Sequence, residues 1–287
     1  MYKKILVGAI AMLGCSQAMA IIVTATDDAD TLANNILGSG ITISNATYFG
    51  SATQSGTFTD DSVFNIGSGI VLTTGSSSTA ADMTNNSDST SIDSGTGGDA
   101  DLDALIGGTT YNAAVLEFDF TTTGGDLFFS WAFASEEYNE FVGSSFNDVF
   151  AFFVDGVNIA LAPDAQVASI NTINCGDPFV GAGPNCSSYN NNDLQDGGPF
   201  FATEYDGFTD ALTASALGLG SGTHHIKIAI ADASDSSWDS AVFIKGGSFS
   251  DTDPSDGDPT DVPEPSILAL LGLGLAGMTI VRRRKQV

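Results

Sequence analysis

An acidic stretch between two apolar segments is the feature that most constrains the fold. Residues 135–153 read SEEYNEFVGSSFNDVFAFF and combine glutamate, aspartate and asparagine with aromatic side chains. Within 127–133, leucine, phenylalanine and tryptophan alternate with other residues, which is the period-two pattern of a strand with one buried face. The apolar run 149–154 predicts a second, buried strand. The acidic residues therefore lie in a connection held by a sheet, where binding residues often occur.

Apolar patterns along the chain predict an all-β fold with one or two short helices. Residues 30–37 fit a short helix that ends at Gly38, and residues 211–217 fit either a helix or a strand. The expected strands lie at 41–44, 69–73, 114–120, 127–133, 147–154, 225–231 and 240–244. Short strands and frequent glycine turns predict an antiparallel β-sandwich, jelly-roll-like.

Two segments predict turns or loops. Gly124 and Gly125 follow the strand expected at 114–120, and glycine at such a place predicts a hairpin with the strand at 127–133. Residues 76–98 are rich in serine, threonine, aspartate, asparagine and glycine, which predicts a long surface loop.

The distribution of charge excludes one large class of function. The chain has 35 acidic and eight basic residues, all acidic residues lie between Asp27 and Glu264, and only Lys227 and Lys245 lie among them. Such a surface repels the phosphates of nucleic acids and attracts cations. We therefore expect no nucleic acid partner.

The N-terminus predicts export. Residues 1–20 contain Lys3 and Lys4, an apolar run over 5–13 and the sequence Ala18-Met19-Ala20, which is the pattern of a signal peptide cleaved by signal peptidase. Leu13-Gly14-Cys15 leaves a lipoprotein signal as an alternative. In an exported protein, Cys175 and Cys186 predict a disulfide that closes a small loop. Two free thiols are the alternative.

The domain expected at 21–249 is followed by two different segments. Residues 250–262 are rich in aspartate and contain two prolines, which predicts a disordered acidic linker. A calcium loop beginning at Asp251 fails, because Asp256 stands where glycine is needed and Val262 where the last glutamate is needed.

Residues 263–287 form a three-part tail. Pro263, Glu264 and Pro265 precede an apolar run over 266–281, and Arg282, Arg283, Arg284 and Lys285 follow it. A helix over the run spans about 24 Å, and snorkelling arginines let it act as a short transmembrane helix. The basic end predicts a cytoplasmic C-terminus, with the domain outside.

Catalytic residues are scarce. His224 and His225 are adjacent on an expected strand, so they face opposite ways and cannot form one site. No zinc spacing, phosphate loop or nucleophile elbow is found in the sequence. A glycosidase needs two carboxylates, which Glu136, Glu137 and Glu140 can supply.

Calcium fits the acidic residues better, because it prefers carboxylate, amide and backbone oxygens in loops. Three groups qualify, and we expect the first two to converge. They are Glu136, Glu137, Asn147 and Asp148; Asp232, Asp235 and Asp239; and Asp99, Asp101 and Asp103, which alternate along an expected extended segment. The alternative is that these carboxylates cap turns by accepting backbone N–H bonds.

Several motifs carry a resemblance to a known family. FASEEYNEF at 133–141, followed by FNDVFAFF at 146–153, resembles the choice-of-anchor L domain of bacterial surface proteins. Further matching pieces lie at 69–75, 98–103, 158–160, 205–209 and 228–244. The resemblance spans roughly residues 30–249 and implies a β-rich extracellular domain joined to varied C-terminal anchors, with no established catalytic activity.

The tail resembles a PEP-CTERM sorting signal of Gram-negative bacteria that make exopolysaccharide. This resemblance implies recognition by an exosortase near Pro263-Glu264-Pro265 and loss of the apolar tail. The expected protein is thus a non-enzymatic cell-envelope or matrix protein that binds polysaccharide or a surface partner. It would pass through the inner membrane to the cell surface or the extracellular matrix. The alternative is a secreted carbohydrate-active hydrolase that uses a carboxylate pair.

Overall fold

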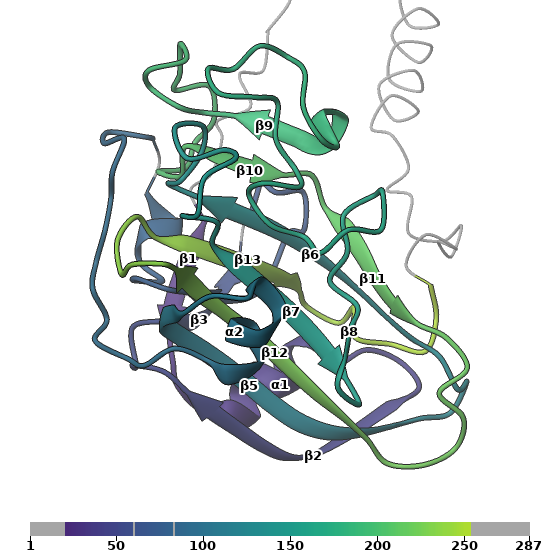
Figure 1. Ribbon diagram of the computed structural model, residues 1–287. Coiled ribbons are helices and arrows are strands. Elements are labelled where there is room, and N and C mark those ends of the chain that lie inside the picture. Colours follow the sequence, from purple (N-terminus) through teal and green to yellow (C-terminus); the bar gives the residue numbers. More distant parts are fainter. Residues whose placement is uncertain (1–20, 60, 83, 254–287) are drawn as a thin grey trace, which may run out of the picture. The chain divides into compact units, whose positions relative to one another are not determined.

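The computed structural model describes residues 21–59, 61–82 and 84–253, which form two antiparallel sheets (Figure 1). In the eight-stranded sheet the order is β1 (Ile22–Ala25), β3 (Ser55–Thr59), β4 (Gly69–Thr73), β13 (Ser240–Lys245), β6 (Leu127–Ser135), β10 (Gly207–Thr209) and β9 (Tyr189–Asn191), and β11 (Leu212–Ala216) also pairs with β6. In the five-stranded sheet it is β2 (Ile41–Phe49), β5 (Thr110–Thr122), β12 (His224–Ala233), β7 (Val149–Val154) and β8 (Val157–Asn158). The predicted antiparallel β-sandwich is confirmed.

Aromatic side chains from both sheets fill the space between them. Phe133 of β6 stacks on Phe150 of β7 with ring centroids 5.0 Å apart, and Trp131 meets the same ring edge-on at 4.8 Å. The alternation in β6 sends these rings to one face, and its alanines, Ala132 and Ala134, to the other. Ala132 and Ala134 are buried on this outer face, which explains why residues 131–134 are apolar on both faces of the strand.

The two helices begin at aspartate caps. Helix α1 (Ala29–Ile36) starts where the Thr31 N–H donates to the Asp28 carboxylate at 2.7 Å, and it confirms the helix predicted near 30–37. Helix α2 (Ala100–Ile106) was not predicted. It packs on the outer face of the five-stranded sheet in front of β5, β12 and β7 (Figure 1).

The hairpin predicted at Gly124 and Gly125 is wrong. Strands β5 and β6 belong to different sheets, so the glycine turn carries the chain across the sandwich. The inward residues of both strands, such as Phe118 and Trp131, belong to the same core. Alternation therefore identified both strands correctly but could not show whether they pair side by side or face one another. Within residues 211–217, for which the sequence fits either a helix or a strand, Leu212–Ala216 form strand β11.

The predicted disulfide between Cys175 and Cys186 is present, with the Cα atoms 4.7 Å apart. Cys186 opens the short 3-10 turn η2 (Cys186–Ser188), which leads directly into β9. A second such turn, η1 (Thr79–Ala81), lies in the predicted loop at 76–98. The disulfide thus fixes an irregular segment to the start of an edge strand.

Several predictions fall outside the described residues. These are the signal peptide, the linker from residue 254 onward, and the sorting motif with its apolar run and basic end. At the start of the predicted linker, Ser250 exchanges two backbone hydrogen bonds with Phe128, at 2.8 and 3.0 Å. No helix within the described ranges is long and apolar enough to cross a membrane.

Candidate functional site: a buried carboxylate cluster

Strand pairing brings the two predicted acidic groups together. Ser135 at the end of β6 pairs with Ser240 at the start of β13. Glu136, the residue after Ser135, therefore lies beside Asp239, the residue before Ser240. On the other sheet, Ala231 of β12 pairs with Val149 of β7, which places Asp232 and Asp148 at neighbouring strand ends. The acidic connection 136–148 crosses from one sheet to the other at this end of the sandwich.

The carboxylates at these strand ends are withdrawn from solvent. Glu136, Asp148, Asp232 and Asp239 are 0% exposed and Glu137 is 2% exposed. Asp235 is only half-buried, but it lies close enough to Glu137 and Asp148 to raise the pKa of both carboxyls. We call Glu136, Glu137, Asp148, Asp232, Asp235, Asp239 and their neighbour Asp206 the carboxylate cluster.

Backbone N–H, hydroxyl and amide groups donate hydrogen bonds to some of the carboxylate oxygens in the cluster. Asp148 accepts from the Ala233 N–H at 2.8 Å and from the Ser240 hydroxyl at 2.6 Å. The Asn112 amide donates to Asp232 Oδ2 at 3.0 Å. These contacts come from residues of β5, β12 and β13, so the sheets themselves hold the carboxylates in place.

The loop at 76–98 supplies further donors, which its polar composition did not predict. The Ile92 N–H donates to both oxygens of Asp239, at 3.0 and 3.1 Å. The Thr90 N–H donates to Glu136 Oε2 at 3.2 Å. Part of this predicted surface loop therefore packs against the carboxylate cluster and donates hydrogen bonds to it.

Other oxygens of the cluster have no hydrogen-bond partner among the described residues. They are Glu136 Oε1, Glu137 Oε2, Asp206 Oδ2 and Asp232 Oδ1, each on a side chain that is at most 2% exposed. A buried charged oxygen without a partner is costly. The described residues therefore do not supply enough hydrogen-bond donors or positive charge to compensate for burying these carboxylates.

Burial is the main cause of strongly raised pKa values in the cluster. It raises the pKa of Glu136 to about 11, helped by the nearby charge of Asp206, and that of Glu137 to about 10, helped by Asp148. The pKa values of Asp148 and Asp239 rise to about 7 for the same reason. Burial likewise raises the pKa of Asp232 well above its usual range. The carboxyls therefore favour a proton or another cation.

Asp206 and Glu204 are members of this region that sequence reasoning missed. Asp206 is 0% exposed, its Oδ1 accepts from the Asn85 amide, and burial raises its pKa to about 9. Glu204 accepts from the Thr90 hydroxyl at 2.7 Å. Both precede β10, which pairs with β6 next to Ser135. The motif at 205–209 contains Asp206, but its spacing indicated no role for it, and Glu204 lies just before the motif.

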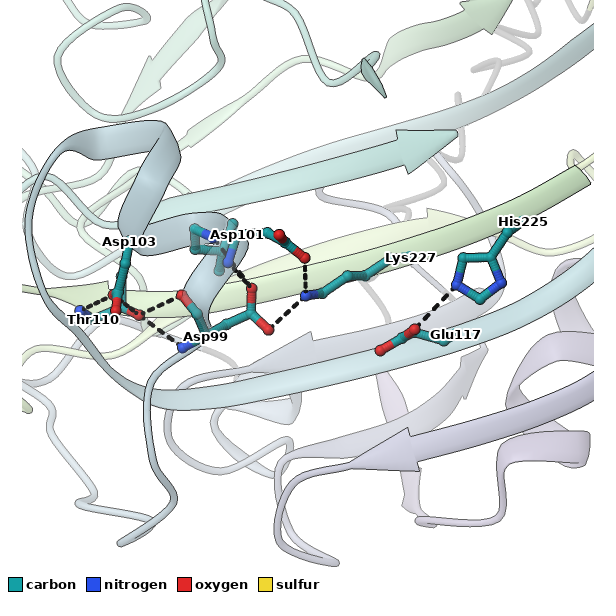
Figure 2. A network of polar contacts seen from close by, with 8 residues as sticks. Asp99, Asp101, Asp103, Thr110, Glu117, His225 and Lys227 are labelled. Atoms are coloured by element: carbon teal, nitrogen blue, oxygen red, sulfur yellow. Dashed lines mark hydrogen bonds and ion pairs between the residues drawn. The ribbon is translucent and has the colours of Figure 1, made fainter. Parts of the chain in front are cut away.

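The third predicted group forms a different structure. Asp99 caps α2 by accepting from two N–H groups, and Asp103 accepts from the Thr110 N–H and hydroxyl at 2.6 and 2.7 Å (Figure 2). The expected extended segment is thus wrong from residue 100 onward, because the bonds to Asp99 start a helix that ends at Gly107. Lys227 binds Asp99 and Asp101 at 2.7 and 2.6 Å. This lysine is therefore not available to the carboxylate cluster.

Two observations limit how a metal could bind. Asn147, a predicted ligand, uses its side-chain oxygen to accept from the Asn171 N–H at 2.8 Å. Within the described ranges, no three histidine, cysteine, aspartate or glutamate side chains converge closely enough to hold a metal ion. A calcium ion here would need main-chain, amide or water oxygens beside its carboxylates, which calcium accepts.

The family comparisons agree with this architecture. The model of the choice-of-anchor L domain matches residues 22–250, and that of the PEP-CTERM protein-sorting motif matches residues 261–285. This chain belongs to the choice-of-anchor L domain family and carries a PEP-CTERM sorting motif. The sorting motif marks an exported protein, directed to the surface of a Gram-negative cell and processed by exosortase. No curated protein and no solved structure matches the chain.

Proposed function

We propose that this chain is a non-enzymatic protein of the cell envelope or extracellular matrix whose sandwich domain binds calcium at the carboxylate cluster. The observation that carries the proposal is the set of buried carboxylate oxygens without partners. Calcium held by two neighbouring carboxylates, Glu137 and Asp148, would supply the missing positive charge. Main-chain oxygens would complete its coordination.

The surroundings of the cluster favour an ion from solution over a side-chain cation. Lys227 is held by two aspartates on the outer face of the five-stranded sheet. Within residues 21–253 as described, no basic side chain forms an ion pair with a member of the cluster. A divalent ion that binds only the folded state would stabilise the domain in the calcium-containing environment outside a cell.

The acidic surface would meet polysaccharide or another surface protein once exosortase has removed the tail. The alternative function, a glycoside hydrolase, needs two carboxylates that a substrate can reach. Glu136 and Glu137 are 0% and 2% exposed. Their burial favours a binding role for the domain over hydrolysis.

Calcium titration calorimetry on the exported protein tests the metal. The wild type should bind calcium, and Asp148→Asn should weaken binding about tenfold or more, because a charged ligand becomes neutral. Asp164→Asn, an exposed aspartate outside the cluster, is the matched control and should bind as the wild type does. Equal affinity in all three proteins would place calcium elsewhere.

A further inference from the structure

The outer face of the five-stranded sheet carries a hollow that shares no residue with the carboxylate cluster. It measures about 530 Å³ and lies between α2 and strands β5, β7 and β12. Its walls include Asp101, Leu105, Glu117, Phe153, His225 and Lys227. A volume of this size suits a small organic ligand.

Strand register explains why these side chains meet. Lys227 of β12 pairs with Glu117 of β5 on one side and with Phe153 of β7 on the other. Residues directly opposite each other in antiparallel strands point to the same face. His225 precedes Lys227 by two positions and therefore shares this face. The sheet thus presents an ordered row of a carboxylate, an ammonium and an aromatic ring.

The polar groups of the hollow are fixed by contacts behind them. Lys227 donates to Asp99 and Asp101 at 2.7 and 2.6 Å (Figure 2). The ring of His225 lies between Glu117 and Asp119, with both distances 3.0 Å. Groups that are already held in place bind a ligand at a smaller cost in side-chain entropy.

The hollow contains both hydrogen-bond donors and hydrogen-bond acceptors. An ammonium has three N–H groups, and the two aspartates take two from Lys227. Glu117 and Asp101 are 38% and 62% exposed and present free acceptor positions. Counted with Asp99 and Asp119, which contact Lys227 and His225, the carboxylates at the hollow outnumber its two basic groups. Their excess disfavours an anionic ligand, and the ammonium of Lys227 among them disfavours a cation, so the hollow suits an uncharged ligand that both donates and accepts hydrogen bonds.

Half of the lining is apolar and defines the ligand further. Phe153 is half-buried, so part of its ring faces the hollow beside Leu105 of α2. A sugar ring combines hydroxyl groups, which suit the carboxylates and the lysine, with C–H faces that pack on an aromatic ring. We propose that this hollow binds one neutral sugar residue of a polysaccharide. The proposal rests on polysaccharide binding by the domain, as put forward above.

Titration with sugars tests the ligand class. The full-length chain, in a detergent without a sugar headgroup, is titrated with neutral hexose and pentose disaccharides, a glucuronate disaccharide, glucosamine and arginine methyl ester. At least one neutral disaccharide should bind more tightly than any of the three charged probes. Tighter binding of a charged probe, or no binding by any neutral sugar, would overturn the proposal.

Three variants locate the site. Glu117→Gln and Phe153→Leu should each lower the affinity for the bound disaccharide about tenfold, because each removes one recognition element. Asp164→Asn, outside the hollow, should bind as the wild type does. If the wild type and the two hollow variants bind equally, the sugar site lies elsewhere and the proposal is wrong.

Co-sedimentation with the exopolysaccharide of the host separates this inference from the broader function. If the wild type binds the exopolysaccharide and both hollow variants, Glu117→Gln and Phe153→Leu, do not, the result supports the sugar site and the broader polysaccharide function. Binding by all three proteins leaves the polysaccharide function standing and rejects this hollow. If the wild type fails to bind, polysaccharide is not a partner of the domain, and the hollow is rejected with it.

Discussion

At the scale of single residues, the backbone fits closely around the buried carboxylates. A Cβ atom at Gly75 would lie 1.7 Å from Asp239 Oδ2. Sequence spacing predicted Asp239 and its companions, because short motifs at strand ends are visible in a sequence. It could not reveal Asp206 or the donors at Thr90 and Ile92, because these approach only after distant segments have folded together. Gly75 lies two residues after the end of β4 and belongs to this long-range fit.

Gly75→Ala should destabilise the domain by about 1–3 kcal/mol, because the added methyl overlaps the Asp239 carboxylate. Gly97→Ala is the matched control, since a Cβ atom there meets nothing within 4 Å. Urea unfolding of both variants measures the difference. Equal stability of the two variants would show that the carboxylate moves away freely and that the close fit is unimportant.

At the scale of elements, apolar patterns located strands well, but they did not show features that depend on contacts with distant segments. Strands β4 and β6 were predicted closely, whereas α2 was missed because Asp99, Asp101 and Asp103 alternate like residues of an extended segment. The capping bonds of Asp99 favour the helix instead. The disulfide was predictable because only two cysteines follow the expected signal peptide, and both lie in one loop-rich segment.

Replacing both Cys175 and Cys186 by alanine should lower the free energy of unfolding by about 2–3 kcal/mol, because the unfolded chain gains freedom. Urea unfolding measures the loss, and the wild type in a reducing agent should lose about the same amount. An unchanged stability in both samples would mean that the disulfide does not constrain the unfolded chain.

At the scale of the whole molecule, the domain combines a large apolar core with a strong excess of acidic residues. The chain carries 35 acidic residues against eight basic ones, and the most deeply buried acids gather at one end of the sandwich. Surface carboxylates are solvated at little cost, whereas buried ones need a proton, a donor or a metal. Composition predicted the attraction for cations, but only the fold shows which carboxylates have lost their water.

Because these carboxyls are buried, the stability of the folded domain without metal should fall as the pH rises. Their folded-state pKa values are raised, from about 7 for Asp148 and Asp239 to about 11 for Glu136. The folded domain without metal therefore keeps protons that the unfolded chain releases. The resulting stability is complete below the unfolded pKa near 4 and is lost as pH rises through the folded values. Calcium would replace the protons, so its effect must grow with pH.

Thermal unfolding of the wild type at pH 5 and pH 9, in saturating calcium and in chelator, is the most direct test of the calcium proposal. We expect the Tm in chelator to fall by more than about 5 °C from pH 5 to pH 9, because deprotonation leaves uncompensated buried charge. Calcium should raise the Tm strongly at pH 9 and little at pH 5. A Tm that is the same in calcium and in chelator at pH 9 would contradict the account.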